Sequence, residues 1–184
     1  MFSNSAPMVL DVLPHCSSVS RDGWQGADDE RPLSDKGFKE AAILATLAAA
    51  GVQAVYTSPA ARCRQTVEPL AEIVGAPITL DDRLREASGF AEPAVWTEGI
   101  FAPIGQALGG AWVAGRGIAV VDELVSRHSG GHAVLCSHGD LIPAVLVHLA
   151  AAFGCPLPQV VDRGGWYRLQ FGTGELSMTG IHPA

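Results

Sequence analysis

Short apolar runs alternate with segments of helical character along this chain, and this alternation constrains the fold more than any other feature. Residues 8–13 (MVLDVL) form an apolar run of the length that a buried strand prefers, and comparable runs occur at 53–57, 77–80 and 132–137. Segments with helical signals lie between them. The pattern predicts an α/β fold, a three-layer α/β/α sandwich with a mostly parallel central sheet covered on both faces.

Residues that start and stop helices delimit the first two predicted helices. Ser34 is a capping residue, and its helix continues until Gly51 supplies a left-handed stop. Ser58 is a cap followed by Pro59, the residue favoured at the first helical position, so the second helix begins there. Pro69 is expected to kink or end this second helix.

The second half of the chain predicts two more helices and a closing hairpin. Residues 111–128 have helical apolar spacing, and residues 141–153 form an apolar helix that is too short to span a bilayer. The runs at 166–171 and 175–180 are typical of a β-hairpin. The segment 90–110 is spaced by proline and glycine; we interpret it as a lid or insertion, while its aromatic residues are equally compatible with a core role.

Length and composition restrict the class of protein. With 184 residues, of which 48% are hydrophobic and 17% charged, we expect residues 1–184 to form a single domain. The net charge of −7 argues against a nucleic-acid partner, which would require many Lys and Arg side chains. The four cysteines contain no CxxC pair, and residues 1–14 lack the features of a signal peptide, so we expect a cytoplasmic protein with no membrane association.

Four chemically capable residues follow predicted strands: His15, Arg62, Glu86 and His138. Ligands of open sheets bind beyond the carboxyl ends of strands, so these side chains are expected to converge. Each alone has an ordinary structural explanation, such as a satisfied histidine or a surface ion pair. Together they suit phosphoryl transfer, which needs a nucleophile, cations for the phosphoryl oxygens and a proton donor, and a neutral imidazole is nucleophilic near pH 7 without a metal.

Five short motifs occur in a specific order: LPHC at 13–16, RPLSDKG at 31–37, SPAARCRQT at 58–66, LRE at 84–86 and SHG at 137–139. In this combination the chain resembles the histidine phosphatase (phosphoglycerate-mutase-like) superfamily, especially its short bacterial phosphohistidine-phosphatase-like members and the phosphatase half of some actinobacterial Nudix fusion enzymes. Each motif alone is a weak pattern, whereas their ordered combination is specific.

The resemblance implies a role for each of the four residues. His15 would be the nucleophile that becomes a transient phosphohistidine, Arg62 and His138 would hold the phosphoryl group, and Glu86 would be the proton donor. The implied activity is that of a metal-independent phosphomonoesterase, without a cofactor, acting on a small phosphorylated substrate or a phosphoprotein. The identity of the substrate and the oligomeric state are left open.

Pro14 departs from the family pattern, because an arginine is expected immediately before the nucleophilic histidine. Loss of one preorganised transition-state donor typically costs about 2.7–4 kcal/mol, or roughly 10²–10³ in rate. Arg21, in the loop after His15, is the predicted replacement as a phosphate-binding residue. Arg64 is expected to point away from the ligand of Arg62, because residues two apart on a helix lie on roughly opposite faces.

Three alternatives remain beside a phosphatase. The first is a catalytically impaired family member that binds a phosphorylated ligand or partner, which Pro14 favours. The second is a metal site built from His15, Cys16, Cys136 and His138, although the spacing does not match that of zinc sites. The third is a mutase, which must exclude water and hold a second phosphate, but the sequence has no additional basic cluster for this purpose.

Overall fold

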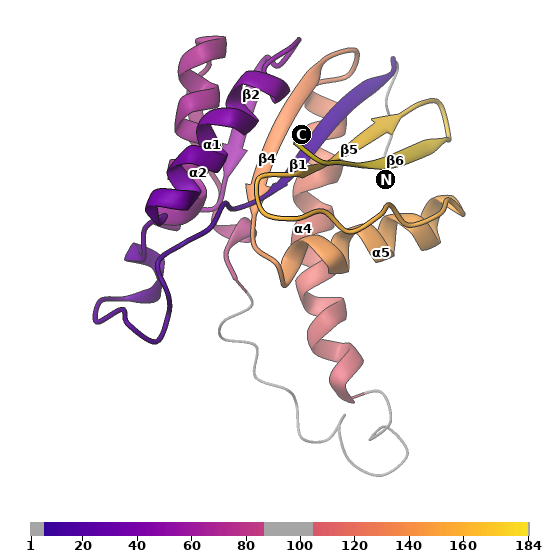
Figure 1. Ribbon diagram of the computed structural model, residues 1–184. Coiled ribbons are helices and arrows are strands. Elements are labelled where there is room, and N and C mark those ends of the chain that lie inside the picture. The colour runs from indigo at the N-terminus through magenta and orange to yellow at the C-terminus, as the bar shows by residue number, and fades with distance from the viewer. Residues whose placement is uncertain (1–5, 87–104, 184) are drawn as a thin grey trace.

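A mixed sheet forms the centre of the molecule in the computed structural model, which describes residues 6–86 and 105–183 (Figure 1). The strand order is β3-β2-β4-β1-β5-β6. The first four strands are parallel to one another, and β5 runs antiparallel to both β1 and β6. The strands are β1 (Met8–Pro14), β2 (Ala54–Thr57), β3 (Ile78–Leu80), β4 (His132–Ser137), β5 (Trp166–Phe171) and β6 (Leu176–Ile181). The predicted α/β class, the mostly parallel sheet and the closing hairpin are confirmed.

Helices cover both faces of the sheet, as the predicted three-layer sandwich requires (Figure 1). Helices α1 (Asp35–Ala48) and α2 (Ala61–Val74) pack on one face, and α4 (Gly105–Arg127) and α5 (Leu141–Phe153) pack on the other. No helix within the described ranges is long and apolar enough to cross a membrane.

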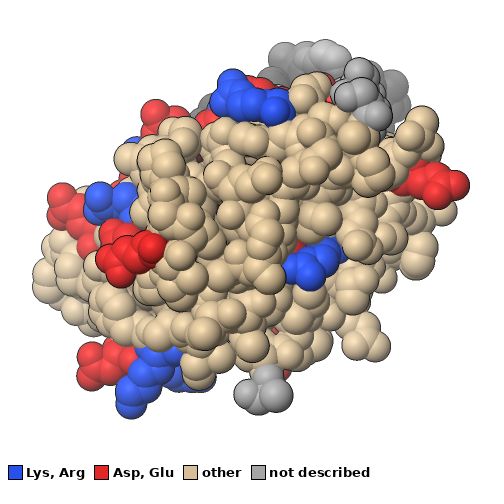
Figure 2. Space-filling view, turned by 90° about the horizontal axis from the view of Figure 1, so that it is seen from above, with Lys and Arg blue, Asp and Glu red and all other residues tan. Residues whose placement is uncertain are grey.

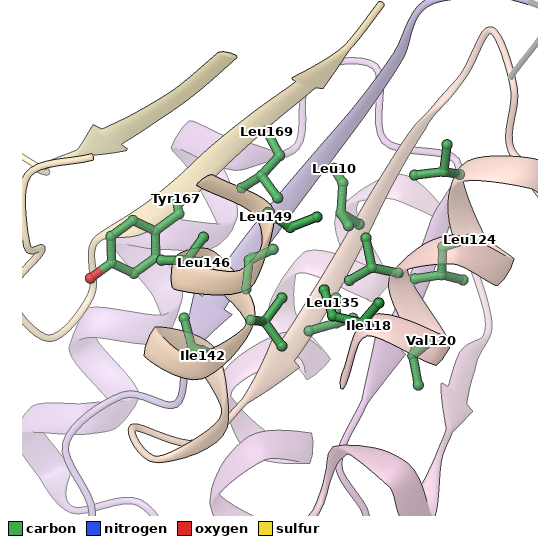
Figure 3. Close-up of a cluster of buried hydrophobic side chains, with 14 of the residues drawn as sticks. Leu10, Ile118, Val120, Leu124, Leu135, Ile142, Leu146, Leu149, Tyr167 and Leu169 are labelled. Carbon is green, nitrogen blue, oxygen red and sulfur yellow. The ribbon is translucent and has the colours of Figure 1, made fainter. Parts of the chain in front are cut away.

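Alternation along the strands divides the buried side chains between the two faces. Leu10 of β1 and Leu135 of β4 face α4 and α5, where they pack with residues such as Leu124 and Leu146 (Figure 3). Leu13 of β1 lies in the cluster beneath α1 and α2. Both faces of the central strands are therefore largely apolar, which explains why these strands read as mostly hydrophobic runs.

The first two helices differ from the sequence prediction at three places. Helix α1 ends at Ala48, before Gly51, whose φ of 80° makes the following turn toward β2. Helix α2 begins at Ala61 and not at Ser58, because the Ser58 hydroxyl contacts the His138 ring instead of capping the helix. Pro69 lies inside α2 without ending it, since buried neighbours in the same helix pack against the sheet and stabilise it.

The segment predicted to be a lid mostly lies outside the described residues. Of 90–110, only 105–110 are described, and they form the first turns of α4, which therefore starts before the predicted residue 111. The sequence prediction placed this start too late because the glycines in the segment weaken the helical pattern.

The parallel strands direct their carboxyl ends toward the same edge of the sheet, shown by the arrowheads of β1, β2 and β4 in Figure 1. Figure 2 shows the molecule from above, at the opposite end, where basic and acidic side chains are interspersed on a mostly uncharged surface. The polar residues singled out in the sequence lie at the first of these two ends.

Candidate active site

The edge formed by the carboxyl ends of β1, β2 and β4 brings together the four residues predicted to share a site. His15 directly follows β1, His138 directly follows β4, and Arg62 lies in the first turn of α2 after β2. Glu86 follows a short 3₁₀ helix, η2 (Asp82–Leu84). The Ser137 hydroxyl, at the end of β4, donates to the Leu84 carbonyl oxygen at 2.8 Å and so holds η2 beside β4. The two histidine ring centroids are 5.5 Å apart.

Hydrogen bonds fix the orientation and the tautomer of His15. Its Nδ1 lies 2.8 Å from the Cys16 carbonyl oxygen, so Nδ1 carries the proton and Nε2 keeps its lone pair. Its backbone N–H donates to the Ser137 carbonyl at 3.0 Å, and the Cys16 N–H donates to the Thr66 hydroxyl at 3.0 Å. Burial lowers the pKa of His15 to about 3, helped by the nearby positive charge of Arg163, although the bond to the Cys16 carbonyl acts in the opposite direction. The imidazole is therefore neutral near pH 7.

His138 and Glu86 form an ion pair in the site. Nδ1 of His138 lies 3.4 Å from Glu86 Oε1, and Nε2 lies 2.8 Å from the Ser58 hydroxyl. Burial lowers the pKa of His138, but hydrogen bonding to Cys63 and to Glu86 outweighs it and raises the pKa to about 9. The same hydrogen bond to His138, together with Arg62, holds the pKa of Glu86 well below its usual range despite partial burial. Within this pair, His138 is thus the protonated group and Glu86 the carboxylate.

Arg62 is fully buried, and its guanidinium is shared between two acidic residues. It lies 3.0 Å from Glu86 Oε1 and 3.0 Å from Asp28 Oδ2, and it also donates to the Asp28 backbone carbonyl at 2.6 Å. Asp28 was not among the predicted site residues. The DDE triplet that contains it lies directly before the RPLSDKG motif, so its proximity to Arg62 depends on the path of the loop and gives no local sequence signal.

Arg21 reaches the site from the loop after His15, but it meets carboxylates there. Its guanidinium lies 3.1 Å from Glu86 Oε2 and 3.2 Å from Asp28 Oδ1, and its side chain is 66% exposed. Arg21 therefore belongs to the Glu86 side of the site, and its phosphate-binding role stays a prediction.

Arg163 lies directly against His15 and was missed in the sequence. Its Nη1 donates to the His15 carbonyl oxygen at 2.5 Å and lies 3.3 Å from Nδ1 and 3.5 Å from Nε2 of the same residue. The predicted hairpin is the feature of the sequence that could have indicated its position. Because β5 runs antiparallel to β1, with Tyr167 opposite Val12, the residues just before β5 must lie at the carboxyl end of β1.

Two adjoining hollows open at this edge of the sheet. One, of about 370 Å³, is lined by His15, Ser18, Arg21, Arg31, Glu86, Gly139, Asp140 and Arg163. The other, of about 540 Å³, is lined by Arg21, Trp24, Gly26, Ala27, Asp28, Asp29 and Glu86. Arg21 and Glu86 line both, so they stand at the boundary between a space beside His15 and a space beside Trp24.

The RPLSDKG motif supports the loop that carries His15. A Cβ at Gly37 would lie 1.9 Å from the Ser17 carbonyl oxygen, so only glycine allows α1 to approach this closely. Arg31 donates to the Ser18 hydroxyl at 2.6 Å and to Asp28 at 2.9 Å. These residues position the loop and Asp28.

One group in the described part of the chain has the composition of a metal site. Ligand atoms of His15, Glu86 and His138 lie within 4.8 Å of one another. The cysteines weighed in the sequence do not belong to this group, and burial raises the pKa of Cys16 to about 12, which keeps it a thiol. The three residues are the same groups that the sequence assigns to phosphoryl transfer.

Comparison with known proteins adds independent information. Residues 15–181 match the family model of the histidine phosphatase superfamily (branch 1). A curated relative, the 8-oxo-(d)GTP phosphatase of Mycolicibacterium smegmatis, is 29% identical over 136 residues, which are 73% of this chain. The aligned part covers only 35% of that relative, so the chain spans about a third of its length.

Solved structures share the fold over nearly the whole chain. YhfR of Bacillus stearothermophilus superposes with a TM-score of 0.67 at 20% identity, covering 92% of this chain and 94% of that one. The protein histidine phosphatase SixA, complexed with tungstate, gives a TM-score of 0.60 at 17% identity, with 96% and 97% covered. At these identities the likeness concerns the fold.

Proposed function

The chain belongs to the histidine phosphatase superfamily, and on this premise we propose that it is a metal-independent phosphomonoesterase that acts through a phosphohistidine at His15. Its membership and its phosphatase-named relatives support a phosphatase-type function in general. The observation that carries the finer proposal is the neutral His15 ring, with its Nε2 lone pair unprotonated, beside the cations of Arg62 and His138.

The first chemical step transfers the phosphoryl group to the enzyme. The lone pair of His15 Nε2 attacks phosphorus, a P–N bond forms, and the bond between phosphorus and the leaving oxygen breaks with its electron pair on that oxygen. Arg62 and the protonated His138 offset the charge on the phosphoryl oxygens. The Nδ1–H bond to the Cys16 carbonyl stabilises the positive charge that develops on the ring.

The leaving oxygen needs a proton, and Glu86, which lies 3.4 Å from Nδ1 of His138, is the group placed to deliver it. A phosphoryl dianion beside Glu86 raises the pKa of that carboxylate by like-charge repulsion and takes over its cationic partners. Glu86 then takes a proton from solvent and gives it to the leaving oxygen, while His138 keeps its own proton.

The second step returns the enzyme to its starting state. As a carboxylate, Glu86 takes a proton from water, the water oxygen attacks phosphorus, and the P–N bond breaks with its electron pair on Nε2. Inorganic phosphate leaves, Glu86 releases to solvent the proton that it took from water, and His15 is again neutral. Each proton and each bond is thereby accounted for without a metal ion.

The position of Glu86 indicates the side on which the leaving group lies. Because Glu86 lines both hollows, a phosphoryl group beside His15 places its ester oxygen toward the hollow that Trp24 lines. An indole can stack on a planar leaving group. The M. smegmatis relative is named an 8-oxo-(d)GTP phosphatase, so nucleotides with a terminal phosphate belong in the substrate screen beside simple phosphomonoesters and a phosphohistidine peptide.

Pro14 supports the second candidate, a family member that binds a phosphorylated ligand without turning it over. Proline supplies neither a positive charge nor a side-chain donor next to His15. Such a protein would keep its affinity for tetrahedral oxyanions while lacking hydrolysis.

Hydrolysis of p-nitrophenyl phosphate in the presence of EDTA separates the two functions. The set consists of wild type, His15→Ala and Pro14→Arg, with tungstate affinity measured by calorimetry on each. The proposal predicts turnover by wild type and none by His15→Ala. If wild type binds tungstate but turns over no substrate of the screen, and Pro14→Arg alone is active, the binding function is established instead.

A further inference from the structure

Arg163 occupies a position beside His15 that no motif of the chain accounts for. Its Nη1 lies 3.5 Å from Nε2, the nitrogen that keeps a lone pair, and its hydrogen bond to the His15 carbonyl at 2.5 Å holds it there. Arg163 and His15 line the same hollow of about 370 Å³. A guanidinium with five donors so close to a nucleophilic nitrogen faces whatever that nitrogen attacks.

A tight turn holds Arg163 in place on a rigid part of the fold. The Gly165 N–H donates to the Asp162 carbonyl at 3.0 Å, and Gly164 has a φ of 87°, a conformation that favours glycine. The turn leads directly into β5, which pairs along its length with β1. The strand that ends in His15 and the strand that begins after Arg163 are therefore fixed to one another by the sheet.

The ion pairs of the site distinguish Arg163 from the other arginines there. Arg62 and Arg21 each pair with both Asp28 and Glu86, and Arg31 pairs with Asp28. Among the ion pairs formed by residues 6–86 and 105–183, none includes Arg163. An arriving phosphoryl group must compete with carboxylates for Arg62 and Arg21, whereas no carboxylate of the described residues forms an ion pair with Arg163.

We infer that Arg163 is a phosphoryl-binding catalytic residue, which supplies from the β5 side the cation and donors that Pro14 does not supply from β1. The inference rests on the proposed phosphotransfer to His15. Reacting atoms lie about 3–3.5 Å apart before attack, so a phosphorus atom poised at Nε2 has its oxygens within hydrogen-bond reach of the Arg163 guanidinium. Pro14 and Arg163 line one further hollow, of about 340 Å³, so no bulky side chain at position 14 competes with Arg163 for this space.

The test uses Arg163→Ala, Arg163→Lys and the double variant Pro14→Arg/Arg163→Ala, with Arg64→Ala, an exposed arginine of α2, as the matched control. Two readouts are taken for each: kcat/KM for p-nitrophenyl phosphate with EDTA, and tungstate affinity by calorimetry. Urea unfolding of each variant shows whether the fold is kept. His15→Ala is measured beside them.

The expected results form a graded series. Arg163→Ala loses roughly 10²–10³-fold in kcat/KM and binds tungstate at least about tenfold more weakly, Arg163→Lys retains part of both, and Arg64→Ala equals wild type. In the double variant, the new arginine at position 14 restores activity that Arg163→Ala has lost. This rescue separates a phosphoryl-binding role from a role in holding the His15 carbonyl, because an arginine at position 14 cannot restore the latter contact.

Failure of the inference and failure of the proposed function give different results. If wild type turns over, His15→Ala does not, and folded Arg163→Ala stays within twofold of wild type in both readouts, the inference is wrong and the function stands. If wild type shows no turnover, the proposed function fails, and tungstate binding alone decides: equal affinity in wild type and Arg163→Ala overturns the inference, and weaker affinity in the variant supports it.

Discussion

Replacing Glu86 by glutamine should lower the pKa of His138 and flatten the loss of stability at alkaline pH. The carboxylate of Glu86 lies 3.4 Å from Nδ1 of His138, and hydrogen bonding to Cys63 and to Glu86 raises the His138 pKa to about 9 against the effect of burial. Glutamine keeps the shape and an acceptor oxygen but removes the charge. We expect the pKa of His138 to fall by on the order of one unit or more in Glu86→Gln.

The sign of the stability effect follows from linkage. A histidine whose pKa is higher in the folded than in the unfolded state stabilises the fold fully below about pH 6.5, and this contribution is lost as the pH rises through about 9. The full shift of about 2.5 units corresponds to about 3 kcal/mol at most. Because the Glu86 side chain is 29% exposed, solvent screens the pair, and we expect its share of the loss to be roughly 1–2 kcal/mol.

The assay is an NMR titration of the histidine ring signals together with urea unfolding at pH 6 and pH 9. Glu175→Gln, at an exposed position before β6, is the matched control, because it removes the same charge away from the site. Cys63→Ser, run in parallel, measures the second source of the shift. Titration of His138 near pH 6.5 in wild type, or an unchanged titration in Glu86→Gln, would refute the reasoning.

Two further substitutions test the supports of the site. Gly37→Ala should destabilise the protein by about 1–3 kcal/mol and lower kcat/KM, because its Cβ would lie 1.9 Å from the Ser17 carbonyl and displace the loop after His15. Gly115→Ala, whose Cβ would meet nothing within 4 Å, is the control, and equal stability of the two variants in urea unfolding contradicts the packing argument. Arg168→Met should cost about 3–5 kcal/mol, because Arg168 contacts the fully buried Asp11 carboxylate at 2.8 Å through each of two nitrogens. Among the described residues, the substitution leaves only His132 as a side-chain partner of that carboxylate. Arg127→Met, at an exposed i,i+4 pair, should cost far less, and a similar loss in both variants would be the contrary result.

The layered architecture could be predicted from the sequence because buried strands and helices have characteristic patterns of apolar residues. Strands β1 and β4 are covered on both faces, so they read as mostly apolar runs, and the last two strands form the hairpin that their spacing predicts. Helix starts were less predictable. Ser58 carries a capping side chain, yet its hydroxyl is taken by His138, which is 80 residues away in the sequence.

The candidate site shows the same division between local and long-range information. His15, Arg62, Glu86 and His138 each follow a strand, so the rule that parallel strands end at one edge was enough to group them. Arg163 is 148 residues from His15 and has no motif, and only the antiparallel register of β5 on β1 places it there. Asp28 likewise reaches Arg62 through the path of a loop, which the residue pattern does not specify.

The central claim is that His15 itself carries the phosphoryl group during turnover. The most direct measurement is rapid acid-free quenching of the enzyme with substrate and EDTA, followed by intact-protein and peptide mass spectrometry. The account predicts a single phosphoryl adduct on the peptide that contains His15, labile to acid and stable to base, and absent from His15→Ala. Turnover without any adduct in wild type, or turnover that survives in His15→Ala, would contradict it.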